Sequence, residues 1–396
     1  MQDTPKGNRI HIAFFGRRNA GKSSIINAIS NQQVSIVSNV AGTTTDPVYK
    51  AMELFPIGPI MLIDTAGLDD EGYIGNLRIE KTKEIMNKTD IAVIAIDCKN
   101  ENFEYEMYLK EELSRRKIPI IIVLNKIDEV DNLDEVIVRA RKQFDNIVSI
   151  SALRRENIDK LKEKIIEQVS SNNETTLLEG IVNKKDLVLL ITPQDLQAPK
   201  GRLILPQVQV LRDILDKGAM AMVLKDTELQ EGLKNLYKKP DLVITDSQIF
   251  NKVKDIIPRD IKLTSFSVLM ARYKGDIRLL IEGAKSINNL KPGDNILISE
   301  ACTHHSLKGD IAKEKIPNLL KKKIGGEVNI DFSSGEDFTK NIEKYKLIIH
   351  CGGCMLNQKQ MINRLNKANE KNIPITNFGV VLAYLNGILD RVSEVF

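Results

Sequence analysis

Short apolar runs alternate with amphipathic stretches along the whole chain, and this alternation restricts the possible architectures more than any other feature. Each run has the length of a strand, and the stretches between the runs have the apolar spacing of helices. Strands that are separated by helices pair in parallel, with the helices covering the faces of the sheet. We therefore predict an α/β fold with mainly parallel sheets. The clearest runs cover residues 10–15, 60–64, 91–97, 118–124, 147–150, 187–191, 219–224, 242–245, 295–299 and 346–349.

Chain length and one polar linker suggest three domains. The 396 residues suffice for two or three domains that each bury a core. A polar stretch at 170–176 follows a predicted helix at 157–169 and has the composition of a linker. We expect a first domain at 1–172, followed by two smaller α/β domains with mainly parallel sheets at 177–260 and 261–396.

Composition bears on the location and on the class of partner. The formal net charge is +4, from 57 basic and 53 acidic residues, which gives no case for nucleic acid or an anionic membrane as the main partner. The first residues are polar and lack the apolar core of a signal peptide. The apolar runs are also too short to cross a bilayer. The sequence thus predicts a cytoplasmic protein without a nucleic-acid or membrane partner.

The segment after the first predicted strand has the pattern of a phosphate-binding loop. It reads Gly16-Arg17-Arg18-Asn19-Ala20-Gly21-Lys22-Ser23-Ser24 and precedes a predicted helix. The glycines allow backbone N–H groups to close around phosphate oxygens at the N-terminus of that helix. We expect Lys22 to bridge the β- and γ-phosphates and the hydroxyl of Ser23 to bind Mg²⁺.

Three later motifs follow in the order that a guanine-nucleotide site requires. Asp64-Thr65-Ala66-Gly67 follows a strand and is expected to hold Mg²⁺ and to sense the γ-phosphate. Asn125-Lys126-Ile127-Asp128 follows another strand, and the Asp128 carboxylate can accept hydrogen bonds from N1–H and the 2-amino group of guanine. Adenine lacks both donors, so this motif selects GTP. Ser151 and Ala152 follow the next strand and are expected to support the base through a backbone N–H.

A threonine-rich segment lies between the first two motifs. It reads Gly42-Thr43-Thr44-Thr45-Asp46, and Thr44 is our candidate for the mobile threonine that completes Mg²⁺ coordination, with Thr43 as the alternative. Glu71 is a candidate for positioning the hydrolytic water, although an exposed loop glutamate is the simpler interpretation.

The nucleotide motifs resemble those of the Era/TrmE-like group of GTPases. That group places a hydrophobic residue, here Leu68, where signalling GTPases have a water-orienting glutamine. In its potassium-activated members, the asparagine that matches Asn19 helps to hold K⁺. The resemblance implies slow, K⁺-stimulated hydrolysis of GTP to GDP. Thr45 departs from the pattern of tRNA-modifying relatives, which usually have Arg there.

Scarce cysteines and histidines cluster in the C-terminal part of the chain. The sequence has only four of each; Cys302 and His304 follow one predicted strand, and His350, Cys351 and Cys354 follow another. Because the carboxyl ends of parallel strands meet at one edge of a sheet, the two groups are expected to lie close together. Such clustering favours a metal site over a disulfide framework. Cys98 stands apart and is expected to be an inert, packed thiol.

The residues alone leave the nature of this site open. Three thiolates and a histidine suit structural zinc, whereas three thiolates alone suit an iron–sulfur cluster with one exchangeable iron. A redox-active pair of Cys351 and Cys354 is a third interpretation. The fourth ligand of a metal site remains open among His304, His350, water, and a carboxylate such as Asp186 or Asp195.

The whole chain resembles the HydF family of iron–iron hydrogenase maturation GTPases. The likeness rests on the nucleotide motifs, on residues 197–207 (QAPKGRLILPQ) and on the Cys-x-His … His-Cys-x-x-Cys pattern. It implies a homodimer with a dimerisation domain in the middle, and a 4Fe–4S cluster bound by Cys302, Cys351 and Cys354. It also implies a scaffold that receives a diiron precursor from radical-SAM enzymes and passes it to apo iron–iron hydrogenase. The alternative is a ribosome- or RNA-associated GTPase with a structural zinc domain.

Overall fold

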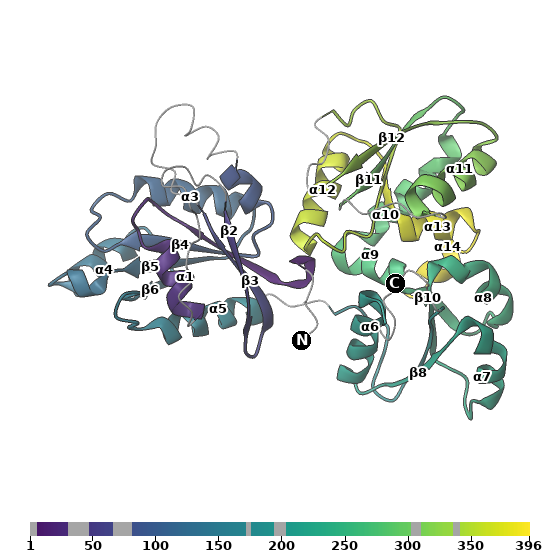
Figure 1. Cartoon of the computed structure of the whole chain (residues 1–396), viewed down its shortest axis with the longest axis horizontal. Coiled ribbons are helices and arrows are strands. Elements are labelled where there is room, and N and C mark those ends of the chain that lie inside the picture. Colours follow the sequence, from purple (N-terminus) through teal and green to yellow (C-terminus); the bar gives the residue numbers. More distant parts are fainter. Residues whose placement is uncertain are drawn as a thin grey trace. The chain divides into compact units, whose positions relative to one another are not determined.

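The structure is a computed structural model that describes residues 6–30, 47–65, 81–171, 176–193, 203–301, 310–335 and 341–396. The chain divides into two compact units, Met1–Glu174 and Thr175–Phe396, which are coloured purple to teal and teal to yellow in Figure 1. Several predicted site residues lie outside the described residues: Thr43, Thr44, Gly67, Leu68, Glu71, Asp195, Cys302 and His304.

The first unit contains a six-stranded sheet with the strand order β2-β3-β1-β4-β5-β6. All neighbouring strands are parallel except β2 and β3. The strands are β1 (Ile10–Phe15), β2 (Val48–Leu54), β3 (Gly58–Asp64), β4 (Ile91–Asp97), β5 (Ile120–Asn125) and β6 (Ile147–Ser149). The α-helices of its described residues include α1 (Lys22–Ser30), α3 (Glu104–Arg115), α4 (Leu133–Arg141) and α5 (Ile158–Ser171).

Burial on both faces of this sheet explains its continuous apolar runs. In β1, Ile12 and Phe14 pack into one core, whereas Ala13 and Phe15 pack into the core on the opposite face. A strand that is covered by helices on both sides has no polar face, so its sequence does not alternate. Edge strand β2 behaves differently, because it is antiparallel to β3 and mostly exposed.

The second unit contains two four-stranded sheets that are parallel throughout, in the orders β10-β9-β7-β8 and β12-β11-β13-β14. The strands are β7 (Leu187–Ile191), β8 (Met220–Leu224), β9 (Leu242–Thr245), β10 (Lys262–Ser265), β11 (Asn295–Glu300), β12 (Asn329–Ser334), β13 (Leu347–His350) and β14 (Ile375–Asn377). The α-helices are α6 (Leu205–Asp216), α7 (Leu229–Asn235), α8 (Phe250–Ile256), α9 (Phe266–Lys274), α10 (Ile277–Lys285), α11 (Ile316–Ile324), α12 (Gln358–Glu370), α13 (Phe378–Leu385) and α14 (Leu389–Ser393). The predicted α/β class with mainly parallel sheets is confirmed.

The two sheets of the second unit share one hydrophobic core. Val243 of β9 and Ile348 of β13 belong to the same cluster of buried residues. Strand β10 begins after residue 260 but pairs with β9, so the first of these sheets extends to Ser265, past the expected start of a third domain at 261. The division of this unit into two domains stays a prediction.

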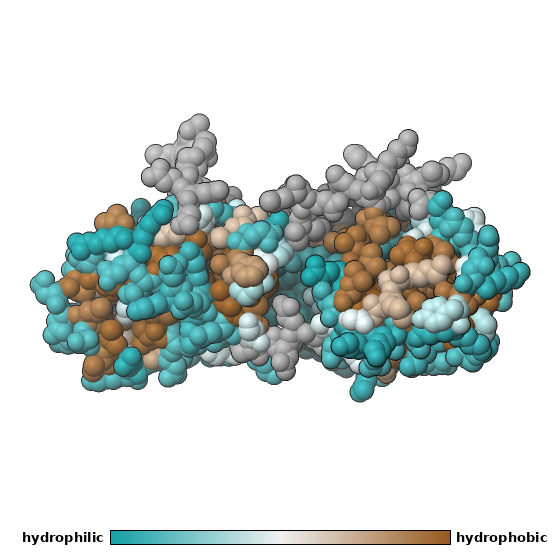
Figure 2. Space-filling model, turned by 90° about the horizontal axis from the view of Figure 1, so that it is seen from below, coloured by the Kyte–Doolittle hydropathy of each residue, from teal (hydrophilic) through white to brown (hydrophobic). Residues whose placement is uncertain are grey.

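Two surface properties of the chain bear on its partners. Among the described residues, no helix combines the length and the apolar character that a membrane crossing requires. Apolar side chains reach the surface of the second unit, at the right of Figure 2. Exposed apolar residues of this unit include Val208 and Leu215 on α6, and Met220 and Val223 on the edge strand β8.

Candidate functional site

Two glycines of the phosphate loop lie where no side chain fits. Gly16 has φ +138°, and a Cβ atom there would lie 2.3 Å from the carbonyl oxygen of Ala95 on β4. Gly21 has φ +87°, and its Cβ would lie 2.2 Å from the side-chain nitrogen of Asn125. The loop therefore packs directly against the sheet and against the predicted base-binding segment. Asn19 adopts a left-handed conformation with φ +63° and is exposed, as is Ser24 at the start of α1.

The side chains predicted to bind phosphate and Mg²⁺ meet at the carboxyl ends of β1 and β3. The Lys22 ammonium group is buried and donates to the carbonyl oxygens of Gly16 at 2.9 Å and Arg17 at 2.8 Å. The Ser23 hydroxyl donates to the carboxylate of Asp64. Burial raises the pKa of Asp64, while the Ser23 hydrogen bond and the charge of Lys22 oppose this shift. This arrangement places a cation, a hydroxyl and a carboxylate where a Mg²⁺–triphosphate group would require them.

Asn125 connects the phosphate loop to the base-binding segment. Its amide nitrogen donates to the carbonyl of Ala20 at 3.0 Å, and its amide oxygen accepts from the N–H of Ala152 at 3.1 Å. The side chain of Asp128 has an exposed fraction of only 6%, with Arg154 at 3.6 Å from Oδ2. Among the described residues, Oδ1 of Asp128 is buried without a hydrogen-bond partner. An orphaned carboxylate oxygen at this position fits the donors of a guanine base.

A hydrogen bond from Ser151 lowers the pKa of Asp128, so this carboxyl stays ionised and able to accept. Lys126 forms an ion pair with Asp97 at the end of β4. The predicted nucleotide residues that the structure describes thus converge on one edge of the sheet.

In the second unit, a loop that contains two cysteines follows β13. The thiol sulfur of Cys351 accepts backbone hydrogen bonds from Ala301 at 3.1 Å and Gly353 at 3.4 Å. Burial raises the pKa of the Cys351 thiol, and these two N–H groups oppose that shift by stabilising the thiolate. Cys354 is exposed, and both cysteines are free thiols. Among the described residues, no group of three or more His, Cys, Asp or Glu side chains could hold a metal ion, and Cys302 and His304 lie outside that part of the chain.

His350 is fully buried, and both of its ring nitrogens are within hydrogen-bond distance of neighbours. Nδ1 lies 2.7 Å from the carbonyl oxygen of Cys351, and Nε2 lies 2.7 Å from Nη1 of Arg364 on α12. Arg364 also donates to the carbonyl of Gly335 at 3.1 Å. Burial and the charge of Arg364 lower the pKa of His350 to about 4, so the ring is neutral. A neutral ring that donates from Nδ1 and accepts at Nε2 satisfies both contacts.

A buried lysine supports the cysteine loop from another helix. Lys274, the last residue of α9, is 2% exposed and donates to the carbonyls of Gly353 at 2.7 Å and Leu356 at 2.9 Å. Burial lowers its pKa to about 8, and the two cysteines oppose this shift. Helix α12 begins at Gln358, because the Asn357 side chain accepts from the N–H of Gln360 and caps the helix there. The cysteine pair therefore lies in a turn before the helix.

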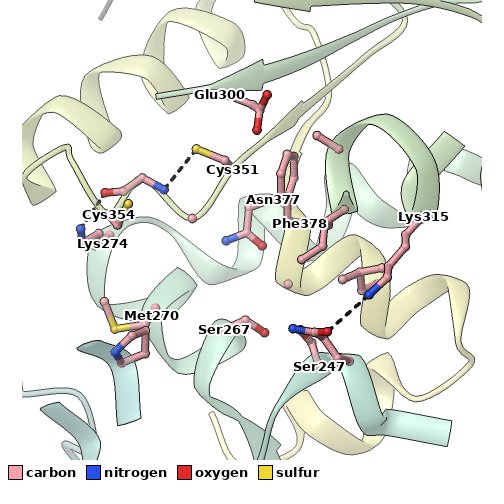
Figure 3. Close-up of a pocket in the computed structure, with 18 of the residues that line it drawn as sticks. Ser247, Ser267, Met270, Lys274, Glu300, Lys315, Cys351, Cys354, Asn377 and Phe378 are labelled. Carbon is pink, nitrogen blue, oxygen red and sulfur yellow. Dashed lines mark hydrogen bonds between the residues drawn. The ribbon is translucent and has the colours of Figure 1, made fainter. Parts of the chain in front are cut away.

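A cavity of about 590 Å³ opens beside the cysteine loop (Figure 3). Its wall includes both cysteines and Lys274, together with Glu300 at the end of β11 and Asn377 at the end of β14. The volume lies within the range of small-ligand sites. Asp186, which immediately precedes β7, does not line this cavity. Its carboxylate accepts from the backbone N–H of Asn183. Sequence reasoning missed Lys274, Glu300 and Asn377, although Glu300 lies only two residues before Cys302.

Three family models match the chain. The model described as "50S ribosome-binding GTPase" matches residues 11–126. The "Hydrogen maturase F dimerization domain" matches residues 177–275, and the "Hydrogen maturase F tetramerization domain" matches residues 278–395. The latter two together cover more than half of the chain.

The chain belongs to the hydrogen maturase F family. Its first unit carries the P-loop GTPase domain, and its second unit carries both segments that define hydrogen maturase F.

Curated relatives match the GTPase part. GTPase Der of Sulfurimonas denitrificans is 32% identical over 195 residues, which cover 46% of this chain and 39% of that protein. The tRNA modification GTPase MnmE of Desulforamulus reducens is 31% identical over 163 residues, which cover 41% of this chain and 35% of that protein. The chain thus spans about two fifths of the length of the curated relatives it matches.

Solved structures also match, with low TM-scores. The structure of Era in complex with MgGDPNP and 16S ribosomal RNA nucleotides is 19% identical, covers 82% of this chain and 92% of that chain, and has a TM-score of 0.36.

Proposed function

We propose that this chain is a GTP-hydrolysing scaffold or carrier in iron–iron hydrogenase maturation that binds a 4Fe–4S cluster. The observation that carries the proposal is the cysteine loop, in which two backbone N–H groups point to the sulfur of Cys351 beside a cavity, in a chain that also has a guanine-nucleotide site. Membership of the family supports the maturation role.

In the nucleotide part, residues of this chain would position the nucleotide and stabilise its charge. Lys22 would release the Gly16 and Arg17 carbonyls and turn to the β- and γ-phosphates. Ser23 and Thr44 would bind Mg²⁺, with Asp64 accepting from the Mg²⁺ shell and Gly67 sensing the γ-phosphate. Asn19, exposed in the loop, would help to hold K⁺. Asp128 would accept from guanine through its orphaned oxygen.

In the second unit, Cys302, Cys351 and Cys354 would hold the cluster. The donors fit, because thiolates are the ligands of such clusters and N–H groups directed to sulfur lower the cost of thiolate charge. When bound, the cluster would supply an iron without a thiolate ligand, at which a diiron precursor can be held and released. The cavity beside Cys351 provides room for that cargo.

The contacts of His350 bear on the identity of the fourth ligand. Nδ1 lies 2.7 Å from the carbonyl oxygen of Cys351, and Nε2 lies 2.7 Å from Nη1 of Arg364. Ligation of a metal by His350 would therefore require one of these contacts to break. This geometry supports a structural role for His350. His304, water, or a carboxylate such as Asp186, Asp195 or Glu300 then remains for the fourth position.

Self-association is the partner relation with the most support. The family models that match the two segments of the second unit are described as dimerization and tetramerization domains. In addition, the exposed apolar residues Met220 and Val223 lie on the edge strand β8. An apolar edge strand that is left open favours pairing with another chain. We therefore propose a homodimer at least, in the cytoplasm, that receives its cargo from radical-SAM enzymes and delivers it to apo-hydrogenase. GTP would act as a switch for partner association.

Metal analysis and electron paramagnetic resonance on anaerobically purified protein test the proposal. We expect about four irons per chain and a reduced-cluster signal, which Cys302→Ala alters or removes. Cys98→Ala is the matched control, because Cys98 is a buried thiol in the other unit. Its iron content should equal that of the wild type. Roughly one zinc per chain with no iron would refute the cluster and favour the alternative with a structural zinc domain.

A further inference from the structure

Asn377 occupies the strand end next to the cysteine loop. In the register of β13 and β14, Asn377 lies directly beside His350, which immediately precedes Cys351. Neighbouring strands are about 4.8 Å apart, so the two residues leave the sheet side by side at the same edge. Asn377 lines the cavity together with Cys351 and Cys354.

The amide orientation of Asn377 is fixed by a helix cap. Its Oδ1 accepts from the N–H of Val380 at 2.9 Å, which caps the N-terminus of α13. Nδ2 must therefore point away from the helix, and Figure 3 shows the nitrogen directed into the cavity. The residue is 5% exposed, and Nδ2 donates to no other group of the described residues. The side chain is held in place by burial, while its donor faces the cavity, so a ligand bound in the cavity can accept from it.

The surrounding charges indicate what this donor would bind. The first N–H groups of α13, at Phe378 and Gly379, have no acceptor within the helix, and the helix dipole adds positive potential there. The buried ammonium of Lys274 lines the same cavity. Two carboxylates, Glu300 and Asp310, also line the cavity, and Asp310 accepts from the N–H groups of Ala312 and Lys313. Two thiols, two lysines (Lys274 and Lys315) and three N–H donors, beside two carboxylates of which Asp310 already accepts backbone hydrogen bonds, favour a small anion with one end bound to a metal.

We propose that Nδ2 of Asn377, with the N-terminus of α13, binds the free acceptor end of a small anionic ligand whose other end is bound to a metal at Cys351 and Cys354. This inference rests on the proposed function, because it requires metal at the cysteines. Asn377 would then favour metal-bound ligands whose other end carries a hydrogen-bond acceptor over ligands that have no acceptor there.

Cyanide is a suitable probe, because its carbon binds iron and its nitrogen remains as a hydrogen-bond acceptor. Asn377→Asp keeps the cap oxygen but replaces the donor, and Asn377→Ser keeps a capping hydroxyl without adding charge. Titration of iron-loaded protein with cyanide, followed by the infrared C≡N stretch, should show the dissociation constant rising roughly 10- to 100-fold in Asn377→Asp. Asn377→Ser should weaken binding less and shift the C≡N stretch in the same direction.

Asn357→Asp is the matched control, since Asn357 caps α12 beside the same loop but does not line the cavity. Its cyanide affinity should equal that of the wild type. Equal affinity and an unshifted stretch in both Asn377 variants, with iron intact, would overturn the inference and leave the proposed function standing. Wild-type protein that holds no iron would overturn both. If Asn377→Asp fails to fold, Asn377→Ser alone decides the question by the same criteria.

Discussion

Replacement of His350 by leucine tests whether this histidine holds the cysteine loop or binds metal. Leucine fills similar space but makes neither of the two 2.7 Å contacts, so the buried Arg364 loses its imidazole acceptor. A hydrogen bond to a charged group contributes about 1.5–3 kcal/mol and a neutral one about 1 kcal/mol. We expect the free energy of local unfolding around β13 and α12 to fall by about 3 kcal/mol.

A double-mutant cycle separates the His350–Arg364 contact from other effects. Arg364→Met should destabilise the same region, because it removes the partner of His350 and of the Gly335 carbonyl. The double variant should lose about 1–2 kcal/mol less than the sum of the single variants. Hydrogen–deuterium exchange, read by mass spectrometry on peptides from β13 and α12, measures local stability in a chain whose two units need not unfold together.

The iron content decides between the two roles of His350. If the residue acts only through the loop, folded His350→Leu protein should keep the wild-type iron content and the wild-type paramagnetic signal. Unchanged exchange rates together with lost iron or an altered signal would refute this reasoning and assign His350 as a metal ligand.

Three further predictions concern the nucleotide site and the remaining cysteine. Lys22→Ala should abolish GTP turnover but leave iron unchanged, and loss of iron as well would contradict the independence of the two sites. Asp128→Asn should weaken GTP binding roughly 100-fold or more and favour xanthosine triphosphate, in calorimetric titration, because the new amide donates to the 2-oxo group. Burial raises the pKa of Cys98 to about 12, so at pH 8 iodoacetamide should label the exposed Cys354 of metal-free protein and leave Cys98 unmodified, by mass spectrometry.

The central strands and the edge strands β6 and β8 were predictable from sequence, whereas the edge strands β2, β10, β12 and β14 were not. The expected bounds of β1, β4, β7 and β9 agree with the structure, since these strands are buried on both faces and form unbroken apolar runs. Strand β2 carries exposed polar residues and pairs antiparallel to β3, so it gives no such signal. Strand β14 has only three residues, too few for any periodicity.

The residues of the candidate sites were also only partly predictable from the sequence. Motif order was sufficient to bring Lys22, Asp64 and Asn125 together, because Lys22 opens the helix after β1, while Asp64 and Asn125 end β3 and β5, which run parallel to β1 in the same sheet. Lys274 could not be identified in this way, since its partner Gly353 is 79 residues away. A lysine in the last turn of a helix normally interacts with the helix dipole at the surface, and only packing shows that this one is buried.

The contacts of the second unit indicate that the conformation of the cysteine loop depends on both hydrogen maturase F segments. Lys274 belongs to the segment at 177–275, yet it holds two carbonyls of the loop in the segment at 278–395. In the reverse direction, Arg391 near the C-terminus donates to the carbonyls of Ile257 at 2.8 Å and Pro258 at 2.6 Å. Buried cations that bridge two segments are costly to leave unpaired, so these contacts hold the segments together. We therefore expect a change in either segment to reach the backbone around Cys351 and Cys354, the two described cysteines that we propose as metal ligands.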